Sequence, residues 1–162
     1  MRVVVLADTH VRVGGRRQLP RRVWAELDLA DAILHAGDVL EGALLDQLAS
    51  IAPLHAVLGN NDHGLQGRLP ERLEVELEGL RVGLVHDSGT RAGRPARLAR
   101  WFPEADVVLF GHSHQPVDEH GVGDQRLFNP GSPTDPRGQP HPTFGVWDID
   151  AGALTARIVQ LV

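Results

Sequence analysis

The chain has 162 residues, of which 42% are hydrophobic and 23% charged, and its net charge at pH 7 is −5. This composition is typical of a globular protein, and we expect one domain over residues 1–162. The absence of cysteine excludes disulfides and thiolate metal sites, the acidic balance disfavours long nucleic acids, and no apolar run approaches the roughly 20 residues of a membrane span, so we expect a cytoplasmic protein without a membrane partner.

The first part of the chain alternates between strand and helix patterns. Short apolar runs predict buried strands, and amphipathic patterns predict helices between them. This alternation indicates βαβ units and a largely parallel sheet. The strands are expected at residues 3–6, 32–35 and 54–58, and the helices begin at Pro20 and near Leu44, the second ending before Pro53.

The second part of the chain begins with a hairpin pattern. Apolar residues alternate with acidic ones over 73–77, Glu78-Gly79 forms a turn, and the chain runs back over 81–85. The Gly- and Pro-rich segment 129–142 is expected to be a long loop of the kind that often carries function. Further elements are expected as a helix over 95–101 and strands over 107–110, around Val117, and over 126–128, 144–149 and 154–161.

Polar side chains that bind metals follow the predicted strands. Because the carboxyl ends of parallel strands gather along one edge of a sheet, these residues can converge. A mixture of carboxylates, imidazoles and one amide suits Mn²⁺, Fe, Ni²⁺, Co²⁺ or Zn²⁺ better than Mg²⁺ alone. An Asp after a strand is by itself more typical of a cap or turn, and a lone His of a surface residue, but the ordered set favours a metal site. Its members are Asp8, His10, Asp38, Asn60, His86, His112 and His114.

These motifs resemble, in order, the signature D-x-H, G-D, G-N-x-D, H and G-H-x-H of the calcineurin-like metallophosphoesterase superfamily. Here they read DTH from residue 8, GD from 37, GNND from 59, His86, and GHSH from 111. The short length and the later NPGS motif are similar to small phosphodiesterases of the YfcE type. The resemblance implies a four-layer αββα sandwich with a two-metal centre at one edge of its sheets. It assigns Asp8, His10, Asp38 and His114 to one ion, and Asp38, Asn60, His86 and His112 to the other, with Asp38 bridging.

The resemblance also implies a reaction. A hydroxide held by two divalent ions, with Mn²⁺ as the first expectation, would hydrolyse a small or activated phosphodiester without a protein nucleophile. A phosphomonoesterase or nucleotide phosphatase of the same fold is the alternative. A non-catalytic scaffold for protein interactions is the weaker alternative, because all seven ligand positions hold competent residues. The sequence leaves the physiological substrate, the native metal and the oligomeric state open, with a homo-oligomer among the alternatives.

The residues after the amide ligand depart from the commoner family pattern. Many members have histidine where this chain has Asn61, and an amide donates hydrogen bonds but does not exchange a proton at neutral pH. We expect Asn61 to contact the phosphoryl group and the enzyme to prefer good leaving groups. Asp62 is expected to brace this loop from behind the site. His63 is a candidate substitute acid, with a solvent-facing loop histidine as the alternative.

Two other groups of polar residues are candidates for substrate binding. In the segment NPGSPTDPR, Ser132 and Arg137 are expected to contact phosphate, with a rigid Pro/Gly connector as the alternative. A basic cluster near the first predicted helix is either a solvated face or a set of arginines that meets an anionic substrate. It consists of Arg12, Arg16, Arg17, Arg21 and Arg22.

Overall fold

The computed structural model describes residues 1–162 as two five-stranded β-sheets and three α-helices. The first sheet has the order β10-β9-β1-β2-β3, with β1 (Arg2–Leu6), β2 (Ala32–His35), β3 (Leu54–Ala56), β9 (Thr143–Asp150) and β10 (Ala153–Gln160). The second sheet has the order β4-β5-β6-β8-β7, with β4 (Arg72–Leu77), β5 (Leu80–Val85), β6 (Val107–Leu109), β7 (Val117–His120) and β8 (Arg126–Asn129). The helices are α1 (Arg21–Leu27), α2 (Gly42–Ala49) and α3 (Arg94–Trp101).

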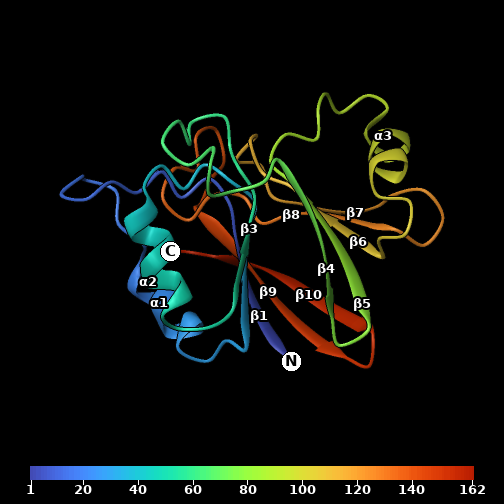
Figure 1. Cartoon of the computed structure of the whole chain (residues 1–162), viewed down its shortest axis with the longest axis horizontal. Helices are drawn as coiled ribbons and strands as arrows, with labels where there is room; N and C mark the ends of the chain where they lie inside the picture. Colours follow the sequence, from blue (N-terminus) through green and yellow to red (C-terminus); the bar gives the residue numbers. More distant parts are fainter.

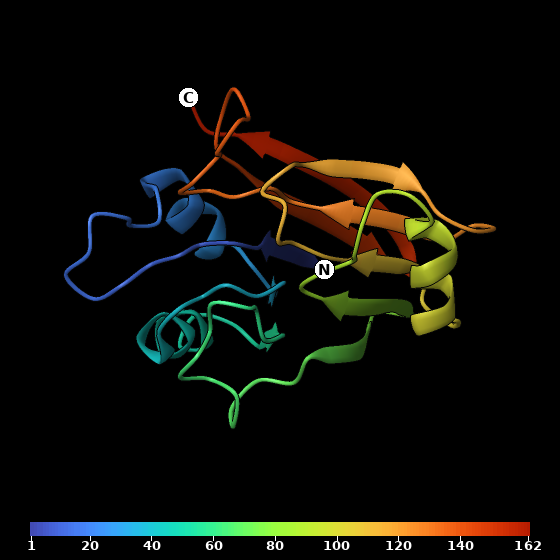
Figure 2. The same cartoon turned by 90° about the horizontal axis from the view of Figure 1, so that it is seen from above.

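The elements form four layers, with α1 and α2 on one side, the two sheets in the middle and α3 on the other side (Figures 1 and 2). Side chains of both sheets meet in one buried cluster that includes Val5, Leu84 and Trp147. A second cluster joins the first sheet to α1 and α2, and a third joins α3 to the second sheet. Three apolar interfaces therefore separate four layers, and the predicted αββα sandwich is confirmed.

The predicted βαβ units are confirmed for β1, β2 and β3, but the prediction of a largely parallel sheet is wrong, because both sheets are mixed. Strands β1, β2 and β3 are parallel, as are β5, β6 and β8, but β4, β7, β9 and β10 pair antiparallel with their neighbours. The hairpins β4–β5 and β9–β10 turn at Glu78-Gly79 and Ala151-Gly152, where all four residues have positive φ. Such two-residue turns connect antiparallel strands only.

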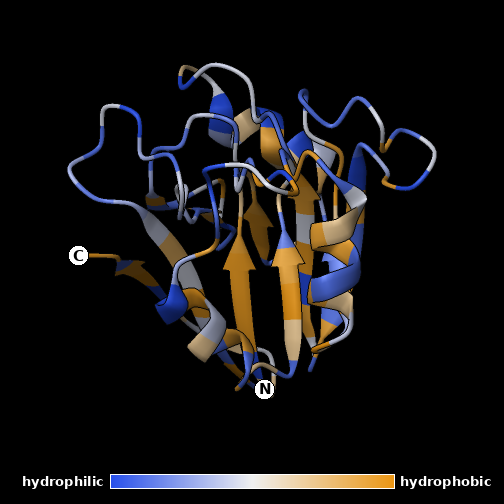
Figure 3. Cartoon of the chain, turned by 90° about the vertical axis from the view of Figure 1, so that its left-hand side faces the viewer, coloured by the Kyte–Doolittle hydropathy of each residue, from blue (hydrophilic) through white to orange (hydrophobic).

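The predicted third strand is shorter than expected and ends at Ala56 instead of Leu58. The N–H of Leu58 instead donates to the carbonyl of Pro70, 2.8 Å away, so the chain has left the sheet and entered a loop. Loops leaving the carboxyl ends of the parallel strands gather at the end of the molecule opposite the N-terminus. They are largely hydrophilic, whereas the strands below them are largely apolar (Figure 3). None of the helices has the length and hydrophobicity of a membrane-spanning segment.

Candidate metal centre

Five loops bring the seven predicted metal ligands together. The loops after β1, β2 and β3 of the first sheet carry Asp8 and His10, Asp38, and Asn60, respectively. The loops after β5 and β6 of the second sheet carry the three remaining histidines. The site therefore lies across the ends of two sheets instead of along one open sheet, and the N–H of His112 links them by donating to Asp8 Oδ1 at 3.2 Å.

Two groups of ligand atoms are close enough to share a cation. Asp8, His10 and His114 form one group, Asp8, Asp38 and His86 form the other, and within each group the atoms lie within 4.8 Å of one another. Asp8 Oδ1 is 3.5 Å from His114 Nε2, and Asp38 Oδ1 is 3.6 Å from His86 Nε2. The bridging role predicted for Asp38 stays a prediction, since Asp8 is the residue common to both groups.

The two buried imidazoles at the centre present lone pairs to the site. Nδ1 of His86 lies 2.7 Å from the carbonyl oxygen of Ala36, and Nδ1 of His114 lies 2.5 Å from that of Asp135. A carbonyl only accepts, so each Nδ1 carries the hydrogen. Burial lowers the pKa of both His86 and His114 below the ordinary value, which keeps the rings neutral. Each Nε2 is therefore an unprotonated metal ligand.

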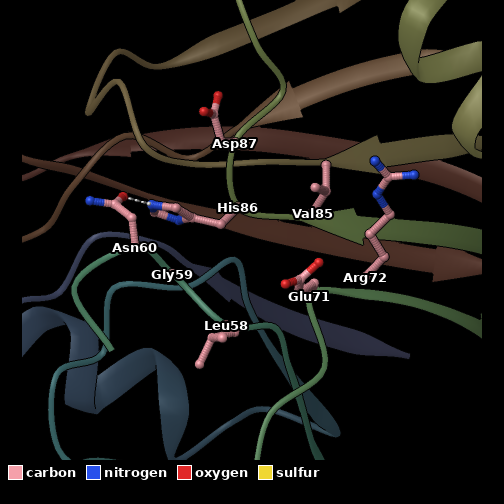
Figure 4. A pocket seen from close by; sticks show the side chains of 8 residues that line it. All are labelled: Leu58, Gly59, Asn60, Glu71, Arg72, Val85, His86 and Asp87. Atoms are coloured by element: carbon pink, nitrogen blue, oxygen red, sulfur yellow. Dashed lines mark hydrogen bonds between the residues drawn. The ribbon is translucent and has the colours of Figure 1, made fainter. Parts of the chain in front are cut away.

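These lone pairs meet other acceptors. Nε2 of His86 lies 2.9 Å from Asn60 Oδ1 (Figure 4). Nδ1 of His112 lies 3.0 Å from the same oxygen. Oδ2 of Asp8 is buried and has no hydrogen-bond partner. Carboxylate oxygens and unprotonated imidazole nitrogens that lie within 4.8 Å of one another are stabilised by a cation, so this set of ligand atoms fits divalent metal ions.

The two carboxylates differ in their proton affinity. Burial, followed by the charge of Asp38, raises the pKa of Asp8 to about 8. Burial also acts to raise the pKa of Asp38, but the charge that His86 carries when it is protonated at low pH, together with two hydrogen bonds from Asn61, outweighs it, and the net direction is down. The main-chain and side-chain amides of Asn61 donate to Asp38 at 2.8 and 2.7 Å. Asp38 is therefore ionised at neutral pH. Asp8 is mostly protonated at this pH, and a bound cation would favour its ionised form.

The main chain at the site is held in an uncommon conformation. Five of the seven candidate ligands have φ between 45° and 69°, the left-handed region that side chains other than glycine rarely adopt. Strain of this kind gathers at functional sites where the surrounding structure enforces it. The five are Asp8, His10, Asp38, His112 and His114. Position 59 also requires glycine, because the loop after β3 passes so close to Asp38 that a Cβ at Gly59 would overlap the main chain and carboxylate of Asp38.

Asp62 is buried, and its side chain contacts the main chain of the loops that carry Asp38 and Asn60. Its side chain is 1% exposed, and its carboxylate accepts the N–H groups of Asp38, Leu40 and Gly59 at 3.0, 2.7 and 2.8 Å. It thereby ties the loop after β2 to the loop after β3. His63 is exposed, and its ring makes no hydrogen bond.

The two predicted phosphate contacts lie in different surroundings. Ser132 is 1% exposed, and its hydroxyl donates to the carbonyl of Asp8 at 2.7 Å while accepting the N–H of Asp135 at 2.9 Å. This contact holds the long loop against the DTH motif. Arg137 is exposed at the rim, 3.5 Å from the carbonyl of His112, and its charge acts to lower the pKa of Asp8.

Sequence reasoning missed His35, the last residue of β2. It is fully buried, Nδ1 accepts the N–H of Gly37 at 3.2 Å, and Nε2 lies 3.0 Å from the hydroxyl of Thr9. Nε2 must then carry the hydrogen and donate it to Thr9. Burial lowers the pKa of His35 to about 3, so the ring is neutral. The available signal was a polar residue inside the apolar run AILHA, which marks a side chain with a specific buried partner.

Comparisons with known proteins agree with this geometry. Residues 1–152 match the model of the calcineurin-like phosphoesterase superfamily domain. A probable metallophosphoesterase of Methanothermobacter thermautotrophicus is 35% identical over 99% of this chain and 92% of its own length. Among solved structures, YfcE, a phosphoesterase from E. coli, is 25% identical with a TM-score of 0.65 over 91% of this chain and 88% of that one.

The fold is also similar to that of Vps29 from Chaetomium thermophilum. That structure has a TM-score of 0.84 at 24% identity, covering 99% of this chain and 86% of that one. The family model spans most of the chain, and it includes all seven candidate ligands. The chain therefore belongs to the calcineurin-like phosphoesterase superfamily.

Proposed function

We propose that this chain is a metal-dependent phosphodiesterase that hydrolyses a small or activated phosphodiester. Its family and its relatives support metal-dependent phosphoester hydrolysis. The observation that carries the proposal is the approach of Nε2 of His114 and of His86 to Asp8 Oδ1, at 3.5 and 4.0 Å, while the other oxygen of this carboxylate, Oδ2, is buried and has no hydrogen-bond partner. The ligands would be Asp8, His10, Asp38, Asn60, His86, His112 and His114, shared between two divalent ions, of which Mn²⁺ is the first candidate.

When bound, the ions would supply positive charge that polarises the phosphoryl group and lowers the pKa of water. The residues of the chain would position the substrate around them. Arg137 is exposed at the rim, and its guanidinium is suited to pairing with a phosphate oxygen. Asp62 and Ser132 would hold the ligand loops in place through their main-chain hydrogen bonds.

No side chain close to the proposed centre is suited to protonating the leaving group. Asn61 is an amide, and both of its donor groups already bind Asp38. His63 is exposed. We therefore propose that the leaving group departs without help from a protein acid, which favours diesters of acidic alcohols and phenols.

The test of the proposed activity uses metal-depleted protein resupplied with Mn²⁺, Ni²⁺, Mg²⁺ or Zn²⁺. Hydrolysis of paired chromogenic monoesters and diesters is measured, and we expect the diester to have the higher kcat/KM. Asp38→Asn should remove the activity, and Asp124→Asn, an exposed turn residue, should not. Inactivity with every metal, or full activity of Asp38→Asn, would refute an enzymatic role. A faster monoester would favour the phosphomonoesterase.

The leaving-group proposal has a separate test. Asn61→His introduces a group that exchanges protons near pH 7, and Asn61→Gln is its control without that property. We expect Asn61→His to raise turnover of a diester with a poor leaving group relative to an activated one. If the ratio of the two rates stays the same in both variants, a missing acid does not determine substrate preference.

A further inference from the structure

A pocket of about 350 Å³ opens beside the candidate metal centre on the side of His10. Nε2 of His10 lies 3.2 Å from Nε2 of His114 and 3.5 Å from Asp38 Oδ2, so one wall of the pocket is part of the centre. The volume lies within the range of about 300–1,000 Å³ that is usual for ligand pockets. Its lining consists of His10, Arg12, Gly15, Arg16, Arg17 and Leu40.

The segment that forms this pocket is positively charged, whereas the protein as a whole is negatively charged. Residues 11–23 contain five arginines and no acidic residue, although the whole chain has a net charge of −5. This segment is the loop that projects beside α1 in Figures 1 and 2, followed by the start of that helix. A local excess of positive charge in a hollow raises the local concentration of anions.

Two of the three lining arginines have no close ion-pair partner within the chain and can bind an anion. Arg16 makes no hydrogen bond and no ion pair within the chain. Arg12 has one distant partner, Glu41 at 3.8 Å, and its side chain is 65% exposed. Such an exposed, loose pair contributes little and is easily exchanged for a better anion.

The loop that carries the arginines is held in place by contacts with segments of the candidate metal centre. Arg17 pairs with the carboxylate of Asp135 at 2.9 Å, and the carbonyl of the same Asp135 accepts the hydrogen bond of His114. The N–H of Val13 donates to Glu41 at 2.8 Å, which holds the arginine loop against the segment after β2. The loop is therefore ordered by contacts to the elements that carry the ligands, and its position does not depend on a bound anion.

The opposite side of the centre has a different character. A pocket of about 340 Å³ beside Asn60 and His86 is lined by the carboxylates of Glu71 and Asp87 (Figure 4). Its single arginine, Arg72, lies over the ring of Trp101 at 3.8 Å. An anion on this side would be repelled by two carboxylates. The two pockets therefore differ in charge, and an anionic group of a substrate is favoured only on the side of His10.

We propose that the substrate carries a second anionic group, a phosphate, on the arm that lies toward His10, and that Arg12 and Arg16 bind it. The uncharged arm then lies toward Asn60. This inference rests on the proposed phosphodiesterase function for the scissile bond. It defines the substrate class as a small phosphodiester with a further phosphate monoester on one side, such as a phosphorylated nucleotide ester.

The kinetic test compares thymidine 5′-(p-nitrophenyl phosphate) with the same compound phosphorylated at the 3′ oxygen. The added phosphate should raise kcat/KM by about tenfold or more, the usual effect of one charge-assisted hydrogen bond. Arg16→Gln, and Arg12→Gln as a second variant, should bring this ratio close to one. The matched control is Arg21→Gln, which removes the same charge from an exposed position on α1 outside the pocket and should keep the wild-type ratio.

Binding gives a readout that does not depend on turnover. By isothermal titration calorimetry, thymidine 3′,5′-bisphosphate should bind wild-type protein about tenfold more tightly than thymidine 5′-phosphate, with a difference that shrinks in Arg16→Gln and at high ionic strength. If neither nitrophenyl substrate is hydrolysed, the proposed function fails, and this comparison still decides the inference. Equal affinity for the two nucleotides, or an equal loss in Arg16→Gln and Arg21→Gln, would overturn it.

Discussion

Replacing Asp62 with asparagine tests how the loops around the centre are held. Its buried carboxylate accepts the N–H groups of Asp38 and Gly59 on Oδ2 and the N–H of Leu40 on Oδ1. Asparagine has the same size but replaces one acceptor oxygen with an NH₂ donor. In either orientation of the amide, at least one main-chain N–H then faces a donor and has no partner.

The expected loss of stability follows from this count. A hydrogen bond to a charged group contributes about 1.5–3 kcal/mol, and a buried N–H left unpaired costs about 1–3 kcal/mol. The remaining bonds also weaken because the acceptor becomes neutral. We expect Asp62→Asn to lower the free energy of unfolding by about 2–4 kcal/mol. For a chain of this size, the melting temperature should fall by roughly 5–15 °C.

Urea unfolding of metal-free protein, followed by circular dichroism, measures this change without a contribution from bound ions. Asp124→Asn removes the same charge from an exposed turn and should stay within about 0.5 kcal/mol of the wild type. A loss below about 1 kcal/mol in Asp62→Asn, with an equal m-value, would show that these three hydrogen bonds do not hold the loops.

Three other predictions concern the same centre. Burial and the charge of Asp38 raise the pKa of Asp8 from 3.8 to about 8. Metal-free wild-type protein therefore loses stability as the pH rises from about 3.8 to about 8, because the folded state holds the Asp8 proton more tightly than the unfolded state does. Urea titrations at several pH values should therefore show Asp8→Asn gaining stability relative to wild type across that window, and parallel curves would contradict the assignment. Gly59→Ala should destabilise by about 1–3 kcal/mol or more, because its Cβ overlaps Asp38, whereas Gly67→Ala, with open space around its Cβ, should leave the melting temperature unchanged. His35→Leu removes two buried hydrogen bonds of β2, one to the hydroxyl of Thr9 in the loop after β1 and one from the N–H of Gly37 in the loop after β2. It should cost about 2–4 kcal/mol in urea unfolding, a result that a near-neutral variant would contradict.

Much of the local structure could be predicted because its causes are local. Apolar runs and turn residues such as Glu78-Gly79 act within a few positions of the chain, and the observed strands lie close to the expected ones. The mixed character of the first sheet could not be predicted in the same way. It depends on β9 pairing with β1, which brings Val3 beside Trp147 across most of the chain.

The candidate ligands could be found from the sequence because ordered motifs mark them at strand ends. Their supporting contacts could not. Ser132 is similar to a phosphate-binding residue in its motif, but in the structure its hydroxyl donates to the main chain of Asp8, 124 positions away. His35 gave only a weak signal, since its role lies in contacts with two loops that meet after folding.

The sequence by itself determined the chemistry available to this protein, namely oxygen and nitrogen ligands without thiolates, an amide at position 61, and a run of arginines before α1. Only the tertiary structure decided how these groups combine. It placed five loops of two sheets around Asp8, left one carboxylate oxygen without a partner, and set an arginine pocket on one side with acidic residues on the other. The physical reason is distance along the chain: side-chain types are properties of single positions, whereas unpaired acceptors and one-sided charge arise from packing between residues that the sequence separates.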